Sequence, residues 1–147
     1  MRCVVTACVS VFLVEDSDPI RTVLTQTLES SGPVRIVGWA DNLDGALERL
    51  GTLVPDAIVI DLRLRSGTGL ELLEWLQASI AHKDTLRIVL TNYASIAFRR
   101  RCTALGAHYF FDKSLEFDRV TELLAGLAPH AASAPTLAPE DRASPVK

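Results

Sequence analysis

The sequence predicts an α/β fold built on one parallel sheet, and two patterns support this prediction. Short apolar runs rich in β-branched or aromatic residues recur along the chain, and none alternates cleanly between apolar and polar positions. This composition is typical of strands that are buried on both faces of a parallel sheet. Segments with helical spacing separate the runs, so strand and helix alternate five times. The predicted strands are Val9–Val14, Val34–Trp39, Ala57–Ile60, Leu86–Leu90 and Tyr109–Phe111.

The segments between these strands have helix start and stop signals. Ser17 can cap a helix with Pro19 in its first turn, and Gly32-Pro33 ends that helix. Asp41-Asn42 can cap the next helix. The spacing places one apolar face of the first helix at Ile20, Val23, Leu24, Thr27 and Leu28. The last three predicted helices are Leu70–Ile80, Ile96–Leu105 and Phe117–Leu127.

The alternation favours a flavodoxin-like, doubly wound (βα)5 sheet with strand order 2-1-3-4-5. In such sheets the site lies at the carboxyl ends of the strands, near the switch point between the first and third strands. We expect one domain over residues 9–128. Residues 129–147 differ in composition, because four of the seven prolines fall there among Ala and Ser, and we expect a disordered tail.

Composition narrows the possible partners and compartment. The 147 residues have a formal net charge of -3, so no overall basic field indicates direct nucleic-acid binding. The apolar stretch Met1–Val14 is too short to span a bilayer and has no clear cleavage site. The three cysteines form no C-x-x-C pair. We therefore expect reduced thiols, a cytoplasmic protein and no membrane partner.

Polar residues follow the predicted strands at one edge of the sheet. Glu15 and Asp16 follow the first strand, Asp61 the third, Thr91 the fourth and Lys113 the fifth. Three carboxylates in one place repel one another, and Mg²⁺ removes the conflict because it prefers carboxylate, water and phosphate oxygens. A carboxylate nucleophile, a cation, a lysine and a hydroxyl are the groups needed to place a phosphoryl group on an aspartate.

The chain resembles the response-regulator receiver family of two-component signalling. The resemblance covers about Val9 to Leu127, and Thr91 lies 30 residues after Asp61 and 22 before Lys113, intervals similar to those of the family. The motifs are V-E-D-S at Val14–Ser17, V-I-D-L at Val59–Leu62, Gly69, L-T-N at Leu90–Asn92, and G-A-H-Y-F-F-D-K at Gly106–Lys113.

The resemblance implies a role for each matching residue. Asp61 would be the phosphoacceptor, Lys113 would contact the phosphoryl group, and Thr91 would be the switch hydroxyl. Phe110 would be the switch aromatic that turns inward when Thr91 moves. The Mg²⁺ ligands would be Asp16, Asp61, Glu15 through a water, and the backbone carbonyl of Arg63.

The family also implies partners. A sensor histidine kinase or phosphotransfer protein would supply the phosphoryl group. A downstream protein would dock on the face formed by the fourth helix, fifth strand and fifth helix. The expected function is a receiver without an output domain of its own, and not an enzyme beyond its own phosphorylation and dephosphorylation.

Two departures and two other functions stay open at this point. Ser114 stands where the family usually has a proline, and Arg63 and Tyr93 are large at positions that tune phosphoryl lifetime in the family. A pseudo-receiver that binds partners without phosphorylation is one alternative. A haloacid-dehalogenase-type enzyme is the other, but it needs a second Asp where this chain has Arg63. The basic run Arg99–Arg101 is either a solvated helix face or part of a docking surface.

Overall fold

The structure is a computed structural model that describes the backbone of residues 8–133 and the side chains of residues 8–127. Its sheet has the order β2-β1-β3-β4-β5, and every neighbouring pair is parallel, so the predicted topology is confirmed. The strands are β1 (Val9–Val14), β2 (Val34–Ala40), β3 (Ala57–Ile60), β4 (Leu86–Thr91) and β5 (Tyr109–Asp112). Two of them match the predicted bounds, and the other three run one residue further.

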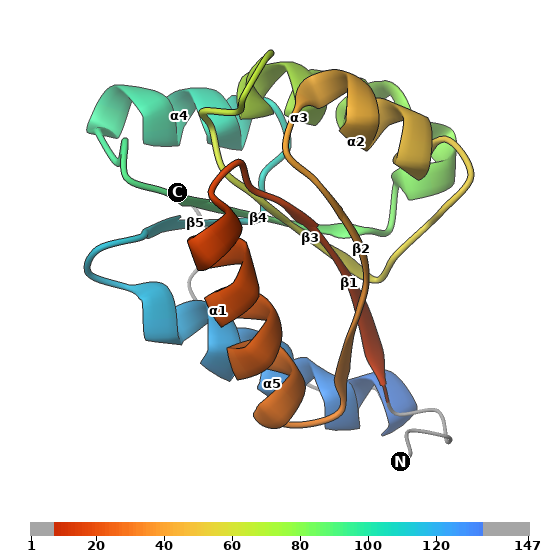
Figure 1. Cartoon of the computed structure of the whole chain (residues 1–147). Coiled ribbons are helices and arrows are strands. Elements are labelled where there is room, and N and C mark those ends of the chain that lie inside the picture. Colours follow the sequence, from red (N-terminus) through yellow and green to blue (C-terminus); the bar gives the residue numbers. More distant parts are fainter. Residues whose placement is uncertain (1–7, 134–147) are drawn as a thin grey trace.

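Helices cover both faces of the sheet, as the doubly wound fold requires (Figure 1). One face carries α2, α3 and α4, and the other carries α1 and α5 (Figure 1). Each face has its own cluster of buried apolar side chains. The helices are α1 (Asp18–Ser30), α2 (Leu43–Leu50), α3 (Gly69–Ala78), the short 3₁₀ helix η2 (Ile80–His82), α4 (Ile96–Ala104) and α5 (Phe117–Ser133).

Side-chain caps fix where the first three helices begin. The Ser17 hydroxyl accepts the Ile20 N–H at 3.3 Å, and the Asn42 side chain accepts the Gly45 N–H at 2.7 Å. Thr68 forms a reciprocal capping box with Glu71, so α3 begins at Gly69 rather than at Leu70. These bonds satisfy N–H groups that the first helical turn leaves unpaired.

The structure differs from the prediction on the buried face of α1. Val23 is 47% exposed, whereas Arg21 is only 9% exposed. Helical spacing identifies apolar positions, but it does not detect a polar group whose partners lie elsewhere in the fold. Leu24 and Leu28 are buried as predicted.

The C-terminal helix extends past its predicted end at Leu127 and reaches Ser133. The added segment is rich in alanine, the strongest helix former. The rest of the expected tail, residues 134–147, lies outside the described residues.

The cysteines differ from one another. Cys102 is a buried free thiol, and burial raises its pKa to about 11. Cys8 is disulfide-bonded, so the expectation of reduced thiols is wrong at that position. Sequence spacing could not show this, because disulfide pairing depends on which cysteines the fold brings together.

In the described part of the chain, no helix has the length and apolar character needed to cross a membrane.

Candidate functional site

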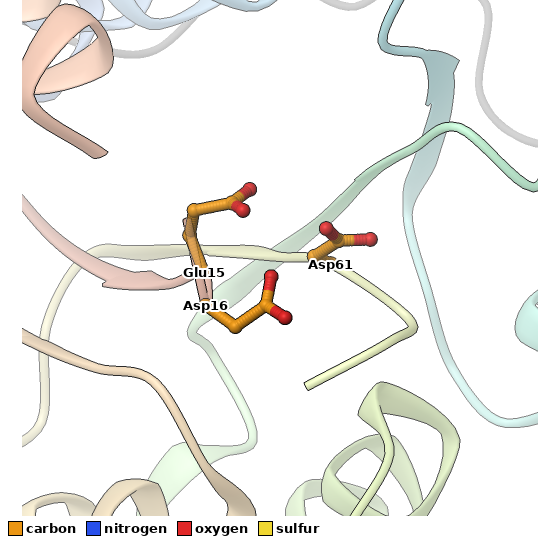
Figure 2. A group of neighbouring side chains, drawn as sticks. All are labelled: Glu15, Asp16 and Asp61. Carbon is orange, nitrogen blue, oxygen red and sulfur yellow. The ribbon is translucent and has the colours of Figure 1, made fainter. Parts of the chain in front are cut away.

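Three carboxylates converge at the carboxyl edge of the sheet. Glu15 and Asp16 leave the end of β1, and Asp61 leaves the end of β3, the neighbouring strand (Figure 2). One carboxylate oxygen from each residue lies within 4.8 Å of the others. Glu15 and Asp61 are buried, with 2% and 6% of their surface exposed, and Asp16 is half-buried. The clustering predicted from the strand ends is therefore present.

Backbone hydrogen bonds hold this convergence in place. Val14 pairs with Ile60 in the parallel register, and the Asp61 N–H donates to the Val14 carbonyl at 2.9 Å. The Glu15 N–H donates to the carbonyl of Ala40, at the end of β2, at 3.0 Å. Three adjacent strands thus fix the main chain at both acidic segments, so the two segments cannot move apart without breaking ladder bonds.

Lys113, which follows the end of β5, contacts two of the three carboxylates. Its Nζ atom lies 2.8 Å from Glu15 Oε1 and 2.8 Å from Asp61 Oδ2. The Lys113 side chain is 9% exposed, and its backbone N–H donates to the Thr91 carbonyl at 2.8 Å. One ammonium group therefore bridges two buried acids, and β4 orients the segment that holds it.

Burial and pairing with Lys113 set the electrostatics of this cluster. Burial raises the pKa of Glu15, the Asp61 charge adds to the rise, and Lys113 and the Ser17 N–H only partly oppose it. Burial alone would lower the pKa of Lys113, but its hydrogen bonds to Asp61 and Glu15 and their charges raise it overall. The two acids therefore hold Lys113 in its charged form, and burial makes the negative charge of Glu15 costly.

The donor set fits a hard divalent cation. Three carboxylates face one ammonium group, and oxygen ligands of this kind suit Mg²⁺. None of the described residues donates a hydrogen bond to the Asp16 carboxylate, so that group is available as a ligand. Arg63, whose carbonyl is an expected ligand, lies two residues after Asp61 in the chain. Its backbone nitrogen lies 3.5 Å from Asp61 Oδ1.

Thr91 and Phe110 lie on the neighbouring strands β4 and β5. Thr91 is fully buried at the end of β4, and its hydroxyl accepts the Tyr93 N–H at 3.1 Å. Phe110 is 3% exposed and packs into the core on the α2–α4 side. The guanidinium carbon of Arg99 lies 4.7 Å from the Phe110 ring centroid, and its Nη1 donates to the Phe110 carbonyl at 3.3 Å.

Because of this contact, the three arginines of the basic run in α4 differ in burial. Arg99 is half-buried against β5, whereas Arg100 and Arg101 are exposed. A solvated helix face therefore describes only the last two arginines.

Sequence reasoning missed two features of the site. Arg63 Nη1 donates to the Tyr93 hydroxyl at 2.6 Å, which joins the two large residues into one contact. A Cβ atom on Gly69 would lie 2.3 Å from the Asp61 carbonyl oxygen, so close approach requires this glycine. Pairing of Arg63 with Tyr93 could have been suspected, since Arg63 lies two residues after Asp61 and Tyr93 lies two residues after Thr91. The family resemblance implies that Gly69 lets the loop after the third strand turn into its helix, but the sequence does not indicate its close approach to the Asp61 carbonyl.

The departure at Ser114 leaves an ordinary backbone. Across the described residues the backbone has no cis peptide bond. The Ser114 N–H and hydroxyl both donate to Asp112 Oδ1, at 2.9 and 2.8 Å, and these bonds lower the pKa of Asp112. The turn after Lys113 is therefore held by side-chain bonds.

Known proteins resemble this chain in sequence and in structure. A protein-glutamate methylesterase/protein-glutamine glutaminase of Halalkalibacterium halodurans is 31% identical over 94% of the chain. The chain spans only 41% of that relative's length. The receiver domain of a DNA-binding response regulator from Colwellia psychrerythraea superposes with a TM-score of 0.75 at 27% identity, covering 82% of this chain and 98% of that one.

A response regulator from Burkholderia pseudomallei, solved with a phosphorylated aspartic acid, calcium ion and citrate, superposes with a TM-score of 0.68 at 28% identity. That match covers 84% of this chain and 70% of the other. A family model described as the response regulator receiver domain matches residues 11–125, and the chain therefore belongs to this family.

Proposed function

We propose that this chain is the phosphoacceptor of a two-component or phosphorelay system, phosphorylated on Asp61 with Mg²⁺. The observation that supports the proposal most is the three-carboxylate cluster with Lys113 bonded to two of its members. The Burkholderia pseudomallei relative, which holds a phosphorylated aspartic acid and a cation, supports it independently. Signalling then proceeds through partner docking.

The transfer is a displacement at phosphorus. A carboxylate oxygen of Asp61 forms a bond to the phosphorus of the donor, and the bond from phosphorus to the donor's nitrogen or oxygen breaks with its electron pair leaving on the donor. Lys113 already holds Asp61 Oδ2, whereas Oδ1 has only the long contact to the Arg63 N–H. Oδ1 is therefore the oxygen available for attack, and Lys113 offsets charge on the phosphoryl oxygens.

The ligands of the cation would be Asp16, Asp61, Glu15 through a water, and the Arg63 carbonyl. The bound ion would supply positive charge to the carboxylates and to the phosphoryl oxygens. The protein's own part is to hold the acids within reach of one another before the ion and the donor arrive, which the ladder bonds of β1 and β3 accomplish.

The readout would use Thr91 and Phe110, with Thr91 donating to a phosphoryl oxygen and Phe110 following its movement. The docking face for a downstream protein would be α4, β5 and α5. A contact supports this assignment, because Arg99 of α4 binds both the ring and the carbonyl of Phe110 in β5. The phosphoryl donor would be a sensor histidine kinase or phosphotransfer protein in the cytoplasm.

Receiver membership supports a role as a signalling switch whose chemistry is limited to its own phosphorylation and dephosphorylation. The methylesterase activity in the relative's name belongs to that longer protein. We also propose that residues 129–147 form a tail that phosphorylation does not require, although α5 itself continues to Ser133.

Mass spectrometry tests the proposal directly. The protein is incubated with acetyl phosphate and Mg²⁺, and a gain of one phosphoryl mass is expected. Asp61→Asn should abolish the gain because it removes the nucleophile. Chelation should also abolish it because it removes the cation that neutralises the carboxylates. Asp84→Asn, which alters an exposed acid outside the cluster, is the matched control. A mass gain that persists in Asp61→Asn would refute the assignment, and no gain in any sample would favour the pseudo-receiver.

A further inference from the structure

A buried arginine of α1 reaches back to the acidic turn. Arg21 is 9% exposed, and its Nη1 donates to the backbone carbonyl of Glu15 at 2.8 Å. Its Nη2 pairs with the Asp18 carboxylate at the start of the same helix. The guanidinium therefore links the end of β1 to the first turn of α1.

The carbonyl that Arg21 binds belongs to the peptide between Glu15 and Asp16. The N–H of Glu15 is held by the Ala40 carbonyl at 3.0 Å, so the Glu15 backbone is fixed on both sides. Rotation of the Glu15–Asp16 peptide would change the direction of both acidic side chains relative to Asp61. The bond from Arg21 opposes that rotation.

Trp39 restrains the arginine in turn. The Arg21 guanidinium carbon lies 3.6 Å from the centroid of the Trp39 ring, the distance of a close cation–π stack. Trp39 directly precedes Ala40 in β2 and is 46% exposed. The end of β2 thus holds the Glu15 backbone twice, through the Ala40 carbonyl and through the stacked Arg21.

We propose that Arg21 is a positioning residue for the cation site and that the stack with Trp39 keeps it in place. This inference rests on the proposed cation-dependent phosphorylation, and it assigns Arg21 no contact with the cation or the phosphoryl group. Its action is on Glu15 and Asp16, whose carboxylates it keeps converged on Asp61. Loss of such supporting contacts commonly weakens metal binding without removing a ligand.

The test measures cation affinity directly, with Mn²⁺ as the probe and electron paramagnetic resonance of the free ion as the readout. Arg21→Met keeps much of the volume but removes the donors, Arg21→Lys keeps the charge without the planar fork, and Trp39→Leu removes only the stack. Arg35→Met, an exposed arginine on the same strand as Trp39, is the control. Circular dichroism well below each melting temperature shows which variants are folded.

We expect Arg21→Met to weaken Mn²⁺ binding about tenfold, with smaller losses in Arg21→Lys and Trp39→Leu and none in Arg35→Met. Saturating metal should restore the phosphorylation rate to within about twofold, because the ligands and nucleophile remain. A purely structural role would lower the melting temperature and leave the affinity of the folded protein unchanged.

Affinities within about twofold of the wild type in folded Arg21→Met would overturn the proposal. If that variant does not fold, unchanged affinity in both Arg21→Lys and Trp39→Leu has the same meaning. Failure of the proposed function has a different signature, because the wild type would then bind no Mn²⁺ or bind it equally well in Asp16→Ala.

Discussion

The two ends of the sheet each bury a basic side chain, but the groups that face it differ. At the carboxyl end, Lys113 lies against the carboxylates of Glu15 and Asp61. At the amino end, Arg87 in β4 is 6% exposed and donates to the carbonyls of Leu76 and His82 at 3.2 and 2.9 Å. Lys113 is part of a charged cluster, whereas Arg87 donates hydrogen bonds to carbonyls near the C-terminal ends of α3 and η2.

The pKa directions of the two cations are opposite. Burial lowers the pKa of Arg87, because only neutral carbonyls compensate its charge. The pKa of Lys113 rises despite burial, because two carboxylates outweigh the cost of desolvation. Carbonyls at helix C-termini bear partial negative charge, which suits a structural cation. Full negative charges that outnumber the cation leave a site ready to take up more positive charge.

The largest expected effect on stability is at the amino end. Arg87→Ala removes both carbonyl contacts and leaves a cavity, so we expect a loss of about 2–4 kcal/mol in the free energy of unfolding. Phosphoryl uptake by the folded fraction should be unchanged. Urea denaturation and mass spectrometry measure the two quantities, with exposed Arg100→Ala as the control. A large loss of uptake in folded Arg87→Ala would show that the two ends are coupled.

Gly69→Ala should affect stability and chemistry together. The added Cβ would meet the Asp61 carbonyl at 2.3 Å, so the Asp61 backbone must shift. We expect a loss of about 1–3 kcal/mol in stability, as in other overpacked sites, with slower phosphoryl uptake at saturating cation. Gly126→Ala is the matched control, because nothing lies within 4 Å of a Cβ there. Normal uptake in Gly69→Ala would mean that Asp61 tolerates displacement.

The sequence allowed the carboxyl end to be predicted far better than the amino end. Asp61 and Lys113 each follow a short apolar strand, and parallel strands bring their carboxyl ends to one edge, so convergence follows from topology. Arg87 lies inside an apolar strand, and its partners are backbone carbonyls of α3 and η2. Carbonyl acceptors have no signature in the sequence, because every residue has one.

The same reason explains why Arg21 was missed. Its acceptor is the Glu15 carbonyl, and its stacking partner Trp39 belongs to another element. Helical spacing favoured Val23 for the buried face, yet Val23 is exposed. Side-chain pairs such as Arg63 and Tyr93 depend on loop conformations that strand and helix patterns do not fix.

Arg63 offers a third cation for the comparison, exposed at the carboxyl end and paired with Tyr93. We expect Arg63→Ala and Tyr93→Ala to leave stability nearly unchanged but to speed phosphoryl loss about threefold to tenfold, a change of roughly 0.7–1.4 kcal/mol in the barrier. We propose that the bonded pair restricts access of water to Asp61. Decay of the phosphorylated protein measures the rate, and slower decay in Arg63→Ala would instead make the arginine a catalyst of hydrolysis.

The smallest effect should be a pH dependence at the amino end. Burial and the charge of Arg87 lower the pKa of His108 below its usual 6.5, and its Nδ1 accepts the Arg87 N–H at 3.0 Å. The folded state therefore favours the neutral imidazole. This contribution to stability is present above the ordinary histidine pKa and is lost as the pH falls below it, because protonation occupies the accepting nitrogen.

His108→Asn keeps an acceptor near the Nδ1 position but does not titrate. Its stability, measured by urea denaturation from pH 7.5 to 5, should fall less steeply than that of the wild type. Parallel curves for the two proteins would show that His108 makes no pH-dependent contribution to the stability of the fold.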